Sequence, residues 1–116
     1  MTGRMAKVNS VIREVLAEEI ERMNDARLEM VSVTGVETAA NLRHATVFID
    51  ALGPEGHDAA LAALNRAAVR LQRAIGAQVR LKYTPILEFE IDPAVVVGER
   101  IDAILRSLPS EDEESE

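Results

Sequence analysis

The sequence has no cysteine and no tryptophan, and only one tyrosine and two phenylalanines among its 116 residues. The absence of cysteine excludes disulfides, thiolate nucleophiles and zinc sites with thiolate ligands. Because nucleobases stack mostly on aromatic side chains, the shortage of rings argues against a broad base-stacking platform. With 47% hydrophobic but only 3% aromatic residues, the core must be built from aliphatic side chains.

Long apolar runs are also missing. The first twenty residues carry a charge every few positions, and no stretch is long and apolar enough to cross a bilayer. We therefore expect a cytoplasmic protein with no membrane partner. A chain of 116 residues has room for one domain and one core.

Acidic residues are distributed unevenly. The net charge is −7, but five of the twenty acids lie in the last six residues, so residues 1–110 carry 13 − 15 = −2. We expect a folded domain over residues 1–108 and a disordered acidic tail over residues 109–116.

Between Ala59 and Leu87 the chain has no acid at all. The charged residues of this window are all basic: Arg66, Arg70, Arg73, Arg80 and Lys82. This cationic window predicts contact with RNA or another polyanion, although a solvated helix face remains the alternative.

Hydrophobic periodicity predicts an α+β fold. A first helix ends at Met23, and the later elements alternate between strand and helix patterns. We expect strands at residues 30–36, 44–52 and 86–92, and helices at residues 58–73, 77–82 and 99–108, with Asp58 as a helix cap and residues 93–98 irregular.

Ala74-Ile75-Gly76 is predicted to be the junction between the two middle helices. A strand–helix–helix–strand unit with a glycine between its helices is the layout of a KH domain, in which the junction backbone holds nucleic acid. Glycine lacks a Cβ, so it allows a sharp turn and a close approach of phosphate. Helical periodicity puts Arg66, Arg70 and Arg73 opposite the apolar side.

No catalytic, metal or cofactor site is predicted. Glu88, Glu90 and Asp92 share one strand face. They could form a metal or acid–base site, or they could simply cover the solvent-facing side of the sheet. We favour the solvent-facing sheet, because no nucleophile or phosphate-loop motif accompanies them. His44 is expected to be a surface residue at a strand end. Arg4, Lys7 and Arg13 either extend the cationic surface or only decorate an exposed helix.

Three segments together carry a resemblance to a known family. The segments NLRHATVFIDAL (41–52), AIG (74–76) and VRLKYTPILEFEID (79–92) resemble bacterial ribosome-binding factor A, and the resemblance covers residues 4–108. An AxG junction in place of GxxG is also a pattern of that family. Ile86 and Asn41 depart mildly from it, because Glu and Asp are common at these positions.

The resemblance implies a type II KH-like domain, α-β-β-α-kink-α-β plus a short C-terminal helix, with helices packed on one face of a three-stranded sheet. It implies a monomeric, non-enzymatic factor that binds small-subunit ribosomal RNA on the free small ribosomal subunit during late maturation, with room for contact with other assembly factors. The implied RNA-binding residues are Arg66, Arg70, Arg73, Ala74, Gly76, Arg80 and Lys82, with Arg43 and His44 either touching RNA or shaping a loop. The alternative is a protein-binding adaptor that uses the acidic tail and the sheet surface without touching RNA.

Overall fold

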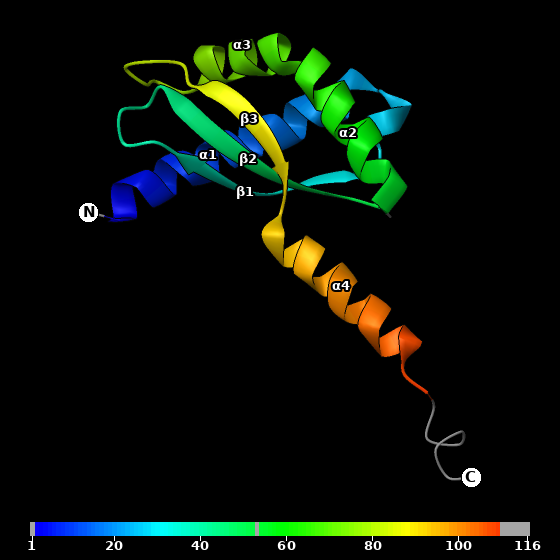
Figure 1. The fold of residues 1–116 in the computed structure, drawn as a ribbon. Helices are drawn as coiled ribbons and strands as arrows, with labels where there is room; N and C mark the ends of the chain where they lie inside the picture. The colour runs from blue at the N-terminus through cyan, green and yellow to red at the C-terminus, as the bar shows by residue number, and fades with distance from the viewer. Residues whose placement is uncertain (1, 53, 110–116) are drawn as a thin grey trace.

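The computed structural model describes residues 2–52 and 54–109. A three-stranded sheet is covered on one face by three helices, and a fourth helix leaves this body (Figure 1). The elements in chain order are α1 (Thr2–Met23), the 3-10 turn η1 (Ala26–Leu28), β1 (Val31–Thr38), β2 (His44–Ala51), α2 (Pro54–Arg66), α3 (Ala68–Gln78), β3 (Ile86–Ile91) and α4 (Pro93–Ser107). The predicted α+β class with helices on one face of the sheet is confirmed.

The sheet is mixed, with the strand order β1-β2-β3. β1 and β2 form an antiparallel hairpin, and β2 pairs in parallel with β3, with His44 opposite Ile86 and Ile49 opposite Ile91. A parallel pair requires a long crossover connection, and α2 and α3 supply it. The crossover places the starts of β2 and β3 at the same end of the sheet.

Alternation along the strands decides which face is covered. Val47 and Ile49 of β2 are fully buried, whereas Phe48 between them is half-buried on the opposite face. On β3, Leu87 and Phe89 are buried, and Glu88 and Glu90 are exposed. The other set of side chains therefore forms an open face that no helix of the body covers.

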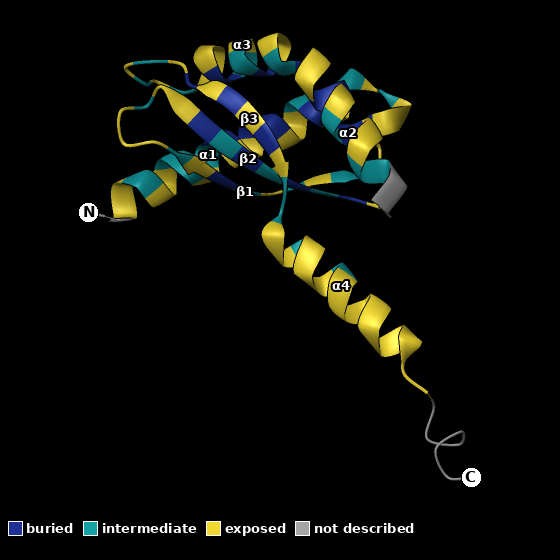
Figure 2. Ribbon diagram, viewed as in Figure 1, coloured by how far each residue is buried: buried dark blue, intermediate teal, exposed yellow. Residues whose placement is uncertain are grey.

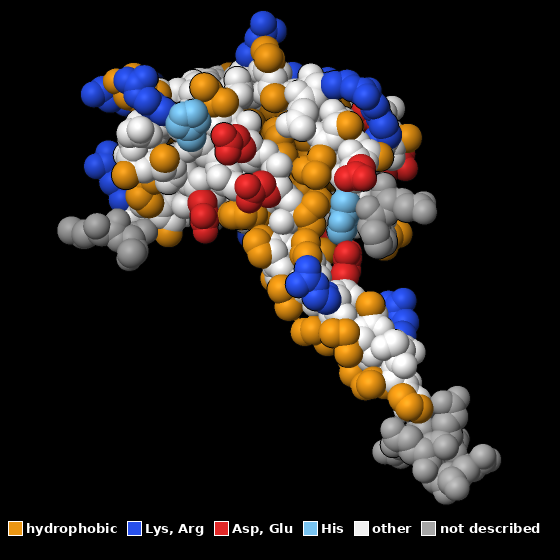
Figure 3. Space-filling view, in the orientation of Figure 1, with side chains coloured by type: hydrophobic (Ala, Val, Ile, Leu, Met, Phe, Trp, Pro, Cys, Tyr) orange, Lys and Arg blue, Asp and Glu red, His pale blue; other side chains and the backbone are white. Residues whose placement is uncertain are grey.

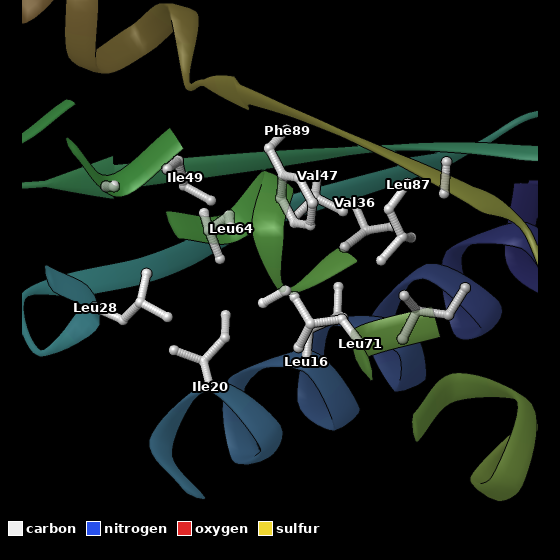
Figure 4. Close-up of a cluster of buried hydrophobic side chains, with 14 of the residues drawn as sticks. Leu16, Ile20, Leu28, Val36, Val47, Ile49, Leu64, Leu71, Leu87 and Phe89 are labelled. Atoms are coloured by element: carbon white, nitrogen blue, oxygen red, sulfur yellow. The ribbon is translucent and has the colours of Figure 1, made fainter. Parts of the chain in front are cut away.

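The core lies between the sheet and the three helices (Figure 4). Leu16 of α1, Leu64 of α2 and Leu71 of α3 are each 0% exposed and converge beneath the buried strand residues. Phe89 is the one aromatic residue in this buried cluster. The sequence prediction of an aliphatic core is confirmed.

The break between α2 and α3 falls at Ala67, so the prediction of a junction at Ala74-Ile75-Gly76 is wrong. Ala67 has φ −89° and ψ 0°, and its N–H lies 3.1 Å from the carbonyl oxygens of both Ala63 and Leu64. This geometry departs from that of an α-helix and redirects the chain. Ala67 is buried, and its single methyl group allows the bend to pack closely against the core.

The helix boundaries around the break also differ from those predicted. α2 begins at Pro54, so Asp58 lies inside the helix rather than capping it, and α3 runs on to Gln78 through the expected junction. Residues 79–85 then form a loop instead of the expected helix at residues 77–82.

α4 begins earlier than expected, because residues 93–98 are helical and not irregular. Asp92 caps the helix by accepting a hydrogen bond from the Ala94 N–H (2.9 Å), and Pro93 occupies a first-turn position where its missing N–H costs nothing. Asp92 also accepts a hydrogen bond from the Thr34 hydroxyl at 2.6 Å. The bonds from Thr34 and Ala94 hold the pKa of Asp92 below its usual range.

α4 has no buried residue and points away from the body (Figure 2). Glu99 Oε1 lies 3.2 Å from His57 Nε2 of α2 and is a contact between α4 and the body. Large apolar side chains of α4 and of its C-cap are exposed: Val96, Val97, Ile101, Ile104, Leu105 and, at the C-cap, Leu108. The predicted acidic tail lies, from residue 110 on, outside the described residues. Among the helices of residues 2–52 and 54–109, none has the length and hydropathy needed to cross a membrane.

Deletion of residues 95–116 is expected to leave the body folded, because α4 contributes nothing to the core. The polar contact between Glu99 and His57 is worth about 1 kcal/mol, so the melting temperature should fall by no more than about 4–8 °C. Leu71→Ala should cost about 2–5 kcal/mol and serves as the comparison. Thermal unfolding by circular dichroism measures both, and a truncated chain that is as unstable as Leu71→Ala would show that α4 supports the body.

Candidate nucleic-acid interface

The cations of α2 and α3 lie on the outer side of the helical layer. Arg66 is the last residue of α2, and Arg70 and Arg73 are one turn apart on α3. All three are exposed, while Leu71 and Ile75 of the same helix are fully buried. The predicted separation of the arginines from the apolar side is therefore confirmed.

One of these arginines is engaged with a carboxylate of the same chain. Arg70 Nε donates a hydrogen bond of 3.0 Å to Glu19 Oε1 of α1, and Arg22 lies 3.5 Å from the other oxygen of Glu19. For Arg66 and Arg73, no carboxylate lies within 4.0 Å among the described residues. Of the three arginines of the predicted stripe, Arg70 is therefore paired within the chain, whereas Arg66 and Arg73 are not paired with any carboxylate of the described residues.

A second group of predicted site residues lies at the end of the sheet where β2 and β3 begin. Arg80 and Lys82 are exposed in the loop of residues 79–85, and Arg43 and His44 are exposed at the start of β2. The Ile86 N–H donates a hydrogen bond of 2.9 Å to the Arg43 carbonyl, which ties the two segments together. The structure therefore brings together four of the predicted residues that are about 40 positions apart in the chain.

Ala74 and Gly76 have a packing role in α3. Ala74 is half-buried and packs against the core. A Cβ on Gly76 would lie 3.1 Å from the Thr84 hydroxyl oxygen, so glycine lets the loop approach the last turn of the helix closely. The role predicted for Gly76 is to let a phosphate approach the backbone. The close contact with Thr84 accounts for the glycine by packing alone.

The charges separate over the surface (Figure 3). Lys and Arg side chains gather at the end with the two loops and along the edge formed by α2 and α3, whereas acidic side chains lie on the open face of the sheet. Arg4 lines a hollow of about 270 Å³ together with Leu42 and Leu81, so the start of α1 adjoins the two loops and extends the cationic end. Lys7 and Arg13 are exposed on the same helix.

Among the described residues, no three of the His, Asp and Glu side chains are grouped in a way that would hold a metal ion. Glu88 and Glu90 are exposed on the open face, and Asp92 is occupied as the cap of α4. His44 is exposed at a strand end, as predicted.

Comparison with known proteins decides the family. The model of the family "Ribosome-binding factor A" matches residues 4–105. The chain belongs to the ribosome-binding factor A family. Ribosome-binding factor A from Rubrobacter xylanophilus is 43% identical over 111 residues, which are 95% of this chain and 91% of that protein. The family member from Geobacter sulfurreducens is 34% identical and covers 96% of each chain.

Solved structures of ribosome-binding factor A share the fold. The crystal structure of the protein from Thermus thermophilus aligns with a TM-score of 0.70 at 33% identity, over 75% of this chain and 94% of that one. The solution structure of a putative family member from Thermotoga maritima aligns with a TM-score of 0.72 at 30% identity, over 79% of this chain and 90% of that one. Ribosome-binding factor A is a family of assembly factors and not of enzymes, in agreement with the prediction that the chain catalyses nothing.

We expect Gly76→Ala to have almost no effect by itself and to stabilise the fold when Thr84→Ala is present. Alanine is favoured over glycine inside a helix by about 0.5–1 kcal/mol, and the contact with the Thr84 hydroxyl offsets this gain until the hydroxyl is removed. Urea unfolding of the four chains of this double-mutant cycle measures the coupling. A loss of stability in the Thr84→Ala background would mean that Gly76 is a genuine hinge.

Proposed function

We propose that this protein binds the free small ribosomal subunit in the cytoplasm as a monomer and assists late maturation of its ribosomal RNA without catalysis. Membership of the ribosome-binding factor A family supports the proposal. Further support comes from a homology model of Thermus thermophilus ribosome-binding factor A fitted into the electron microscopy map of a 30S complex. That model is 35% identical and aligns with a TM-score of 0.60, over 73% of this chain and 91% of that one.

The observation that supports the RNA contact is a set of exposed cations that are not paired with any carboxylate of the described residues. No carboxylate among the described residues lies within 4.0 Å of Arg66, Arg73, Arg80 or Lys82, and all four side chains are exposed. Cations in this arrangement are free to neutralise phosphates and release counterions, which supplies most of the affinity for a polyanion. RNA contact through these residues is therefore the finer part of the proposal.

The contact with RNA would act by shifting the populations of the conformations of the maturing RNA. If the protein binds one conformation of the maturing RNA more tightly than another, the bound conformation gains the difference in binding free energy. Phosphate contacts position the protein on the RNA and carry no sequence information by themselves. Such remodelling needs no nucleotide hydrolysis.

One observation favours protein contact as a second function. The adaptor alternative uses the sheet surface for protein contact, and that surface carries acidic side chains. A better candidate is the exposed apolar side of α4, with Val97, Ile101 and Ile104, which suits a contact with another assembly factor. An apolar contact responds weakly to salt, whereas phosphate contacts weaken steeply as ionic strength rises. The truncated chain without residues 95–116 separates the two contacts.

The double replacement Arg66→Glu and Arg73→Glu should weaken binding to small subunits by about 10- to 100-fold, because two phosphate contacts become repulsive. The measurement is cosedimentation of the purified protein with free small subunits. Arg100→Glu with Arg106→Glu on α4 is the matched control, since it changes the net charge equally on another surface. Equal losses in both double variants would reduce the effect to overall charge and remove Arg66 and Arg73 from the interface.

Glu19→Gln should strengthen binding to small subunits by about two- to five-fold. The glutamine keeps the shape of the side chain but removes the charge that holds Arg70 at 3.0 Å, so Arg70 becomes free to meet a phosphate. Titration of labelled protein with free subunits at fixed ionic strength measures the change. Unchanged or weaker binding would place Arg70 outside the RNA contact.

A further inference from the structure

The single tyrosine of the chain carries a stacked arginine. The guanidinium carbon of Arg43 lies 4.1 Å from the centroid of the Tyr83 ring, and Lys82 Nζ lies 5.5 Å from the same centroid. Arg43 precedes β2, whereas Tyr83 and Lys82 come from the loop before β3. The stack therefore bridges the two segments that enter the parallel strand pair.

The backbone on both sides of the stack is fixed. The Arg43 N–H donates a hydrogen bond of 3.0 Å to the Asn41 side-chain oxygen, and the Arg43 carbonyl accepts one from Ile86. Leu42 has φ +64°, a conformation that costs free energy in a non-glycine residue, and its N–H is bonded to the Ala39 carbonyl at 2.8 Å. A tight turn of this kind holds Arg43 over the ring in advance of any ligand.

Since the Tyr83 ring lies on one side of the guanidinium group and Arg43 is exposed, we infer that the other side of this group faces solvent. Tyr83 is half-buried and covers one side, whereas Arg43 is exposed, and no carboxylate of the described residues lies within 4.0 Å of it. Unpaired bases of RNA stack on arginine planes as well as on aromatic rings. A chain with few aromatic rings can thus still offer a stacking surface. The planar guanidinium group of an arginine that is held on a tyrosine ring can itself receive a base.

We propose that Arg43, held on Tyr83, is a platform for one unpaired base of single-stranded RNA, with Lys82 neutralising the adjoining phosphate. This proposal rests on the proposed function. It adds that the cationic end of the sheet binds an unpaired nucleotide and not an RNA duplex. An acidic peptide would pair with the edges of the guanidinium group and would have no use for its open face. Arg80 and Arg4 lie at the same end and extend the charge available to the flanking phosphates.

The test uses Tyr83 itself as the reporter. Because the chain has one tyrosine and no tryptophan, its tyrosine ring resonances report on this position alone. The full chain is titrated with an oligoadenylate of about six nucleotides, within the site sizes of single-strand binders, and separately with a short RNA duplex. Because the base would lie on the far side of Arg43 and not on the ring itself, we expect a change in the chemical shifts of the Tyr83 ring protons, transmitted through the guanidinium group, with the single strand and no such change with the duplex.

Variants at Arg43 separate stacking from charge. Arg43→Lys keeps the positive charge and loses the plane, so it should lower oligoadenylate affinity by roughly 5- to 150-fold while leaving the salt dependence of binding unchanged. Arg100→Lys on α4 is the matched control and should bind as the parent chain does. Circular dichroism of each variant confirms that it is folded.

The outcomes distinguish this proposal from the function on which it rests. If the Tyr83 ring resonances do not change with oligoadenylate while the chain still cosediments with small subunits, the platform is wrong and the proposed function stands. If Arg43→Lys binds oligoadenylate as tightly as the parent, the contact is purely ionic and the platform is again wrong. An equal response of Tyr83 to oligoglutamate would overturn it in favour of an acidic peptide. Failure to bind small subunits at all would overturn the proposed function itself.

Discussion

The covering of a single sheet face is the constraint on which the rest of the structure depends. Strand alternation places Val47, Ile49 and Leu87 on one side, and an aliphatic core with one ring must bury that side completely. α1, α2 and α3 all pack there, and the bend at Ala67 lets two consecutive helices share the task. Since the apolar sides of the helices face inward, the arginines of α2 and α3 are left on the outer surface.

The strands and the first helix could be predicted because their patterns are local. Period-two alternation of apolar residues in β2 and β3 predicts both that these segments are strands and which of their faces is buried. Packing of the buried faces then determines the register between the two strands. The helix break could not be predicted, because a glycine inside a helix costs only about 1 kcal/mol and tertiary packing decides where the chain bends. The start of α4 did have a local signal, Asp92 followed by Pro93, although the predicted helix began later.

The cations of the candidate interface were visible in the sequence, but their partners were not. The hydrogen bond from Arg70 to Glu19 joins residues 51 positions apart, and the stack of Arg43 on Tyr83 joins two loops. Both contacts arise from the fold and not from spacing along the chain. They change the interpretation of the surface, because Arg70 is paired with Glu19 and Arg43 lies over Tyr83, whereas Arg66, Arg73, Arg80 and Lys82 have no carboxylate within 4.0 Å among the described residues.

The central claim is that a cationic surface of this fold meets the phosphates of the small subunit. The dependence of the dissociation constant on salt, measured for free small subunits, tests it most directly. With about four phosphate contacts, the logarithm of the association constant should fall against the logarithm of salt concentration with a slope of about −3 to −4. A slope near zero would contradict the account, because the protein would then hold the subunit by apolar contacts alone.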